Sequence, residues 1–483
     1  MKSRSHLAVL LCLALAQLAP APPVLAQGLP DLGDPSQVTL SAEQERRIGE
    51  EIMREIRADP AYMDDPELTD YLNGLGYRLA GGSGSRQEFE FFAIRDSSIN
   101  AFALPGGFIG VHTGLVVAAQ SESELASVLA HEIAHVTQKH LARMLAGQRT
   151  SQITSLVAIA VAILAARSNS QISNAAMATA QAANVQNQLN FTRENEREAD
   201  RIGLQILEET GLDPRGMPTF FERMQRGTRL YETSAPSYLR THPLTYERIA
   251  DIQNRTQSLP YRQVADSPEF QLMRAKLLAA EGPPLDAVKF FENNLADRKY
   301  ASEMAQRYGL VAALMRTKDS ARAARELAVL RKGFPQHPAV ETLGGQVLQA
   351  NGQLAAALDL YRQALKNYPE YRALVYGYAD ALIQDRQYGP ALTFITPLLQ
   401  VQRGDPRLYQ LQGRAYAGQG KRLLQHQSLA EAYVRQGNVP GAIDQLQLAV
   451  KAGDGDFYQL SAVEARLREL RAIEAANRKQ QQQ

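Results

Sequence analysis

The N-terminal part of the chain has apolar residues at helical spacing in two segments, 41–57 and 66–79. Ser41 followed by Gln44 is typical of a capping box at a helix start. Asp65 immediately before a proline is typical of a second helix start. The pattern therefore predicts two helices before residue 80.

The spacing of apolar residues then changes. After the glycine- and serine-rich segment 81–85, short apolar runs follow at 89–94, 101–104 and 108–111. The last two runs are separated only by Pro105-Gly106-Gly107, which is typical of a tight turn. These runs predict a small antiparallel sheet.

Helical spacing returns at Ser121, which precedes Glu124 as in a capping box, and it continues into the sequence His-Glu-Ile-Ala-His at 131–135. Another strong helix is predicted from about Arg193 to Glu209. Between them, the apolar run 153–166 is shorter than the ~20 residues that span a bilayer. It predicts a buried helix or one that contacts a membrane surface.

From Pro268 onward a helical repeat can be counted. Ala323, Ala357 and Ala391 are 34 residues apart. The small and large residues between 345 and 369 match the tetratricopeptide pattern. At least four repeats, stacked as a solenoid, are predicted between about 268 and 455.

The predicted fold class is mainly α. It comprises an α+β domain with the small sheet, followed by an α-solenoid. The expected divisions are a signal peptide (1–26), the α+β domain (27–262), the repeat domain (263–473) and a disordered tail (474–483).

Composition and the N-terminal residues exclude some classes of function. The N-terminus has Lys2 and Arg4, then an apolar stretch, then a small residue at Ala26. This order is typical of a cleaved secretory signal peptide, so export of the mature chain is expected. Losing these two charges changes the net charge from +1 to 1 − 2 = −1, which gives no reason to expect nucleic-acid binding. Cys12 is the only cysteine and would leave with the signal, which excludes a catalytic thiolate from the mature chain.

The motif at 131–135 carries candidate chemistry. On a helix, His131 and His135 lie one turn apart on the same face, where both imidazoles can bind one Zn²⁺. Glu132 lies on the flank, where it can act as base on a water without ligating the metal. The alternative is two histidines without a metal on an amphipathic helix.

A third ligand is expected from the acidic start of the second helix. At ~100° per residue, the apolar stripe of that helix centres about 40° from Glu196, about 80° from Asp200 and about 120° from Glu198. Glu196 is therefore the predicted ligand, and Asp200 is placed to accept a hydrogen bond from a zinc-bound histidine. Glu194 and Glu198 are expected to be solvated, as is His140, about 140° round the helix from His135.

These motifs together resemble the HtpX-like gluzincin metallopeptidases, which implies that the α+β domain of residues 27–262 is a zincin-like metallopeptidase domain. The segments that carry the likeness are His131–His135, Glu196–Asp200, Asn100–Gly107, and Thr241-His242-Pro243 with Arg248. With the signal peptide and the repeats, the chain resembles BepA-type periplasmic proteases. The resemblance implies one zinc ion held by His131, His135 and Glu196, with Glu132 as base and Asp200 in support.

The resemblance also implies a role for His242, as a fourth ligand that keeps the enzyme inactive. The rival role is stabilisation of the oxyanion. Ala101, Phe102, Ala103 and Leu104 are expected to form an edge strand that pairs with an extended substrate, or else an ordinary hairpin strand.

The implied function is quality control of outer-membrane β-barrel proteins. A zinc endopeptidase would degrade misfolded or stalled substrates, and the repeats would bind substrate or the assembly machinery. The alternative is a latched protease domain whose repeats act as an adaptor or chaperone. Peripheral membrane contact through 153–166 is possible in either case, and no nucleic acid is expected.

Overall fold

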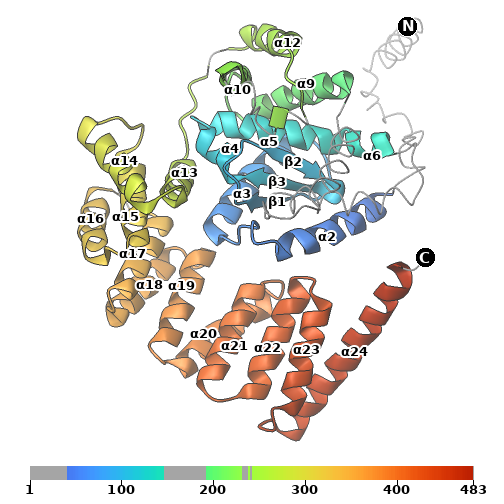
Figure 1. Cartoon of the computed structure of the whole chain (residues 1–483), viewed down its shortest axis with the longest axis vertical. Coiled ribbons are helices and arrows are strands. Elements are labelled where there is room, and N and C mark those ends of the chain that lie inside the picture. Colours follow the sequence, from blue (N-terminus) through green and yellow to red (C-terminus); the bar gives the residue numbers. More distant parts are fainter. Residues whose placement is uncertain are drawn as a thin grey trace, which may run out of the picture.

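The computed structural model describes residues 41–145, 192–230, 238–239, 242–260, 262–334 and 336–481. The signal peptide and the apolar run 153–166 lie outside them. Figure 1 shows a block of helices around a small sheet, followed by a long curved row of helices. Within the described ranges, no helix is both long enough and apolar enough to cross a membrane.

The two N-terminal helices form as predicted. Helix α2 (Ala42–Ala58) begins with a complete capping box, in which Ser41 and Gln44 each accept a hydrogen bond from the other's backbone N–H. Helix α3 (Pro66–Gly82) begins after Asp65, whose carboxylate accepts from two backbone N–H groups of the first turn. Such side-chain caps satisfy donors that a helix cannot pair internally.

The sheet is mixed, whereas the sequence predicted a purely antiparallel one. Its strands are β1 (Glu90–Ile94), β2 (Ala101–Leu104) and β3 (Phe108–His112), in the order β1-β3-β2. The tight turn η3 (Pro105–Gly107) makes β2 and β3 antiparallel, with Ala101 opposite Val111. Strand β1 pairs with the far side of β3 and runs parallel to it, with Glu90 opposite Phe108. Alternation of apolar residues predicts a strand but does not say which neighbour it takes.

One helix runs through the middle of the block. Every residue of α5 (Glu122–Thr137) from Glu122 to His135 is buried, because α5 packs between strand β2, helix α3 and helix α9 (Arg193–Glu209). The boundaries predicted for α9 are confirmed. The remaining elements of the block are α4 (Thr113–Ala118), α6 (His140–Leu145), α10 (Gly216–Leu230) and α12 (Tyr246–Gln257).

The curved row is the predicted solenoid. Its helices are α13 (Pro268–Ala280), α14 (Pro284–Asp297), α15 (Glu303–Arg316), α16 (Ser320–Gly333), α17 (Pro338–Ala350), α18 (Leu354–Asn367), α19 (Arg372–Gln384), α20 (Tyr388–Val401), α21 (Pro406–Gly418), α22 (Arg422–Arg435), α23 (Val439–Lys451) and α24 (Phe457–Gln481).

The 34-residue repeat corresponds to equivalent packing positions in the solenoid. Ala323, Ala357 and Ala391 lie on α16, α18 and α20, and none of them is exposed to solvent. A Cβ atom at Gly345 would lie 2.0 Å from the ring of Tyr361, so only glycine allows that approach. Helix α24 continues to Gln481, whereas a disordered tail was expected from residue 474.

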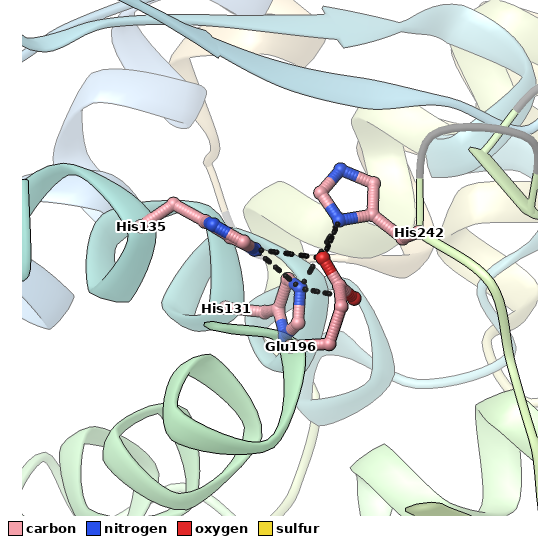
Figure 2. Close-up of side chains that lie close together, drawn as sticks. All are labelled: His131, His135, Glu196 and His242. Atoms are coloured by element: carbon pink, nitrogen blue, oxygen red, sulfur yellow. Dashed lines mark hydrogen bonds and ion pairs between the residues drawn. The ribbon is translucent and has the colours of Figure 1, made fainter. Parts of the chain in front are cut away.

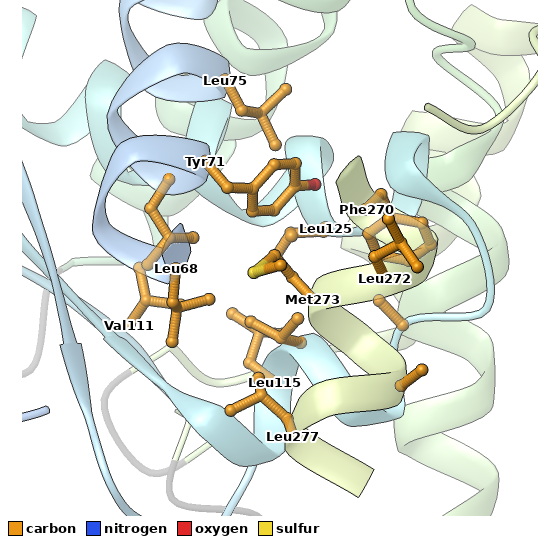
Figure 3. Close-up of a cluster of buried hydrophobic side chains, with 14 of the residues drawn as sticks. Leu68, Tyr71, Leu75, Val111, Leu115, Leu125, Phe270, Leu272, Met273 and Leu277 are labelled. Carbon is orange, nitrogen blue, oxygen red and sulfur yellow. The ribbon is translucent and has the colours of Figure 1, made fainter. Parts of the chain in front are cut away.

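The hydrophobic core does not stop at the boundary predicted between residues 262 and 263. Figure 3 shows Phe270, Leu272, Met273 and Leu277 of α13 packed among buried side chains of α3, α4 and α5. The first solenoid helix is therefore part of the core of the preceding block. The change of sequence pattern marks where the repeats begin, not where the core ends.

Polar contacts hold the same junction. Glu122, at the start of α5, accepts hydrogen bonds from the backbone N–H and the hydroxyl of Ser267, at 3.1 and 2.7 Å. The backbone N–H of Glu122 donates in return to Asp266, at 2.7 Å. On α3, Glu67 is buried and lies 2.6 Å from Lys276 of α13 and 3.1 Å from the Tyr371 hydroxyl, next to α19.

Candidate metal centre

Two histidines of α5 face the same point. The Nε2 atoms of His131 and His135 are 3.0 Å apart, and both side chains are buried. Figure 2 shows the two rings converging with Glu196 and His242. The spacing of four residues on one helix accounts for the convergence, because it places both side chains on one face.

Helix α9 brings a carboxylate to the histidine pair. Glu196 Oε2 lies 3.6 Å from His131 Nε2, and Glu196 Oε1 lies 3.4 Å from His135 Nε2. Bonds of 2.0–2.1 Å at tetrahedral angles place zinc ligands about 3.3 Å apart, so these three donors fit Zn²⁺. Burial by itself would raise the pKa of Glu196, but His242 and the bonds from His131 and His135 hold it well below its usual range.

His242 adds a fourth donor. Its Nδ1 lies 2.9 Å from Glu196 Oε1 and 3.4 Å from His131 Nε2. Its ring stacks on that of Tyr238, with centroids 4.6 Å apart, and its backbone N–H donates to the Tyr238 carbonyl. One donor atom from each of His131, His135, Glu196 and His242 lies within 4.8 Å of the other three.

Glu132 lies beside this cluster without belonging to it. Its carboxylate is buried and comes within 3.5 Å of His242 Nε2. Neither oxygen makes a hydrogen bond with the part of the chain that the structure describes. Burial raises the pKa of Glu132, although the nearby histidines oppose the rise. A carboxylate with a raised pKa is a better proton acceptor.

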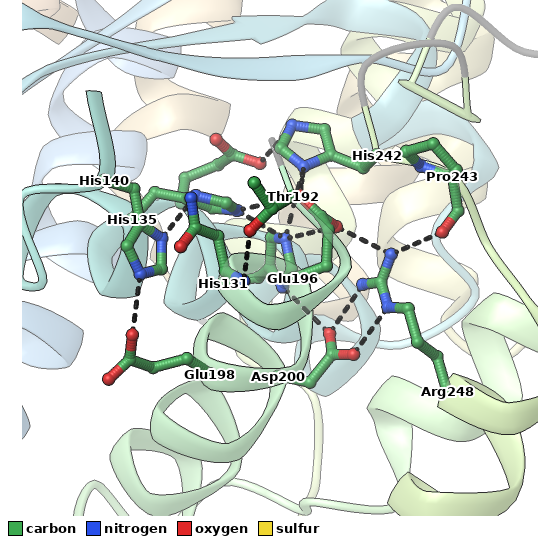
Figure 4. Close-up of polar contacts among 12 residues, drawn as sticks. His131, His135, His140, Thr192, Glu196, Glu198, Asp200, His242, Pro243 and Arg248 are labelled. Atoms are coloured by element: carbon green, nitrogen blue, oxygen red, sulfur yellow. Dashed lines mark hydrogen bonds and ion pairs between the residues drawn. The ribbon is translucent and has the colours of Figure 1, made fainter. Parts of the chain in front are cut away.

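A second layer of charged groups surrounds the four donors (Figure 4). Asp200 lies 3.0 Å from His131 Nδ1, on the side of the ring away from the cluster. Arg248 binds both oxygens of Asp200, at 2.7 and 2.8 Å, and its Nη1 lies 2.6 Å from Glu196 Oε2. The same nitrogen donates to the carbonyl of Pro243, next to His242. Sequence reasoning noted Arg248 only as part of a family pattern and assigned it no role.

The environment predicted for His140 is wrong, because the side chain is fully buried. Its Nδ1 lies 2.9 Å from His135 Nδ1, and its Nε2 lies 3.1 Å from Glu198 Oε2. The helical count failed because α5 ends at Thr137 and Lys139 adopts a left-handed conformation, with φ of 52°. Residues on either side of such a break do not share one helical wheel.

Two other acidic residues of α9 differ in their exposure to solvent. Glu194 is exposed, as expected. Glu198 is only about one-third exposed, with 32% of its side chain accessible, because His140 and Arg143 both contact its Oε2. The expectation that Glu198 would be solvated therefore holds only in part.

The candidate substrate strand lies next to the cluster. Strand β2 is at the end of the sheet order and packs against α5, the helix that carries Glu132. Ala101 is buried, whereas Phe102, Ala103 and Leu104 are partly exposed. An edge strand in this position has backbone groups on one side that a second chain can pair with.

A buried helix bearing HExxH, a carboxylate from a second helix and an adjoining edge strand are the features of a zinc metallopeptidase. The family model described as peptidase family M48 matches residues 66–256, and a tetratricopeptide repeat model matches residues 348–415.

Known relatives identify the group more closely. A beta-barrel assembly-enhancing protease of Yersinia pestis is 32% identical over 94% of this chain and 93% of its own length. That of Escherichia coli strain K12 is 32% identical over 96% of this chain and 95% of its own. The mitochondrial metalloendopeptidase OMA1 of Schizosaccharomyces pombe is 32% identical over 47% of this chain and 64% of its own. The chain belongs to the beta-barrel assembly-enhancing proteases of peptidase family M48.

Proposed function

We propose that this chain is a periplasmic zinc endopeptidase that degrades misfolded or stalled outer-membrane β-barrel proteins. The observation that carries the peptidase activity is the buried Glu132 beside four converging donor atoms. The substrate class is supported by relatives named for β-barrel assembly, which are similar along almost the whole chain. The signal-like pattern of residues 1–26 supports the location.

In this proposal His131, His135 and Glu196 hold the ion. When bound, zinc polarises the scissile carbonyl and makes a water acidic near neutral pH. Glu132 takes the proton of the attacking water as the new C–O bond forms. It then gives that proton to the leaving amine as the C–N bond breaks. The peptide is cut without a covalent enzyme intermediate.

The exposed side of β2 positions the substrate. An extended peptide that pairs with Phe102–Leu104 would lie along α5, with its carbonyl groups near Glu132. Backbone pairing is independent of side-chain identity, which suits a protease for misfolded chains. The solenoid supplies a second surface, which we propose binds substrates or their assembly machinery.

The direct test uses purified protein and an unfolded outer-membrane β-barrel protein. We expect cleavage that a chelator abolishes and that one equivalent of zinc per chain restores. A folded β-barrel protein in detergent is the matched control and should resist. Equal cleavage of both forms would contradict the proposed quality-control role.

The ligand assignment predicts unequal effects for two acids of α9. Glu196→Ala removes a donor and should lower zinc affinity by well over 100-fold, whereas loss of an outer contact typically costs about 10–100-fold. Glu198→Ala should therefore retain much more zinc after dialysis against a zinc buffer. Equal zinc loss in both variants would show that Glu196 is not the ligand.

His242→Ala distinguishes the two roles for this residue. With its Nδ1 among the donors, His242 can occupy the position that water needs. If nine-tenths of the molecules are latched in this way, removing the ring should raise casein cleavage by about tenfold. A fall of about 100-fold would instead support oxyanion stabilisation. No change would leave His242 with a structural role only.

A further inference from the structure

His140 lies in an unusual environment for a histidine outside the metal-binding motif. It is fully buried, and each of its ring nitrogens lies within hydrogen-bond distance of another side chain. One neighbour is His135, and the other is Glu198 (Figure 4). Burying an imidazole is unfavourable unless its nitrogens are hydrogen-bonded, so this placement requires both contacts.

The hydrogen bonds that join His135, His140 and Glu198 allow one arrangement of the ring protons when His135 binds a metal. His135 faces the other donors through Nε2, and a nitrogen that binds a metal carries no proton. The proton of His135 is therefore on Nδ1, which donates to His140 Nδ1 at 2.9 Å. His140 must then carry its own proton on Nε2, which donates to Glu198 Oε2 at 3.1 Å.

Arg143 contacts Glu198, the last residue of this hydrogen-bonded series. Its Nη2 lies 3.0 Å from the same oxygen of Glu198. The carboxylate is thereby held by a cation on the surface while it accepts from a buried ring. Helix α6 supplies both His140 and Arg143, because it begins directly after the break at Lys139.

The other histidine of the motif is supported more directly. His131 Nδ1 lies 3.0 Å from Asp200, with no residue between them. On α9, Glu198 lies about 160° round the helix from Asp200, so it cannot approach the cluster from the same side. The His140 ring lies between Glu198 and His135 and connects them through its two nitrogens.

We propose that His140 and Glu198 are positioning residues that orient the zinc ligand His135, as Asp200 orients His131. The proposal rests on the assignment of His135 as a ligand in the proposed function. Each histidine of the motif then has its own carboxylate on α9, the helix that also carries Glu196. The five residues 196–200 supply one ligand and two orienting acids.

The proposal predicts a graded response at residue 140. His140→Leu removes the acceptor that lies 2.9 Å from His135 Nδ1 and should weaken zinc binding by about 10–100-fold. His140→Gln offers an amide oxygen to His135 and an amide N–H to Glu198, so it should bind within about threefold of wild type. A residue needed only to fill space would show no such difference between Leu and Gln.

The experiment measures zinc affinity of the full-length protein by competition with a chromophoric chelator, and checks folding by circular dichroism. Glu198→Ala should weaken zinc binding like His140→Leu, while Glu194→Ala, an exposed acid on the same helix, should not change it. The double variant His140→Leu/Glu198→Ala should be no weaker than His140→Leu alone, because the two residues act in series. Cobalt substituted for zinc should show altered visible bands in both single variants.

A folded His140→Leu protein with zinc affinity within twofold of wild type would overturn the proposal, as would His140→Gln binding as weakly as His140→Leu. If His140→Leu does not fold, the comparison of Glu198→Ala with Glu194→Ala decides alone. Failure of the wild-type protein to bind zinc would count against the proposed function itself. If wild type binds zinc and cleaves substrate while the variants bind zinc equally well, only the positioning role of His140 and Glu198 would be contradicted.

Discussion

Replacing Glu132 with Gln should leave zinc bound and lower peptide cleavage by about 10³-fold, within the 10²–10⁴-fold range of general base catalysis. The amide is close in size to the carboxylate but cannot take a proton from water. None of the four converging donors is altered, because Glu132 is not among them. The measurement is the initial rate of casein cleavage beside the zinc content of the same sample.

The matched control for this variant is Glu194→Gln. It removes the same charge from an exposed position on α9 and should cleave at the wild-type rate. Near wild-type cleavage by Glu132→Gln would mean that another group is the base. Loss of zinc together with activity would mean that Glu132 helps to hold the ion, and the assignment of ligands would need revision.

A fragment ending at Pro260 should fail to fold, although the sequence pattern predicts a separable metallopeptidase domain up to residue 262. It lacks the six buried side chains that α13 contributes to the core, of which Phe270, Leu272, Met273 and Leu277 are the four large ones. Burial of each contributes about 1.5–3 kcal/mol, hence about 6–12 kcal/mol together. That is comparable to the ~5–15 kcal/mol that stabilises a whole protein.

The matched fragment ends at Gly333 and keeps helices α13–α16. It should unfold cooperatively on heating and bind one zinc ion, whereas the shorter fragment should show no thermal transition and no stoichiometric zinc. Circular dichroism and zinc analysis of both fragments test this. A shorter fragment that unfolds cooperatively with zinc bound would contradict the prediction and support an autonomous domain.

The sequence predicted best what depends on neighbouring residues. Helix α9 runs from Arg193 to Glu209, the bounds that the sequence predicted. The repeat in the solenoid was visible because each hairpin contacts mainly its neighbours, so Ala323, Ala357 and Ala391 are equally buried at equivalent positions.

What escaped prediction depends on residues far apart or on a local break. The parallel pairing of β1 with β3 depends on which strand fills the space between β1 and β2, which apolar alternation does not encode. The exposure of His140 was predicted wrongly because residues Thr137–Lys139 contain no glycine or proline to indicate that the helix ends there. The insertion of α13 into the core was missed because its apolar residues fit a repeat equally well.

The reciprocal bonds between Glu122 and residues 266–267 have a mechanical consequence. Together with the packing of α13 in the core, they join the first solenoid helix directly to the N-terminal end of α5. A force applied to the solenoid is therefore transmitted to the N-terminal end of α5, a rod of 16 residues that is about 24 Å long. Near its other end, the same rod carries His131 and His135.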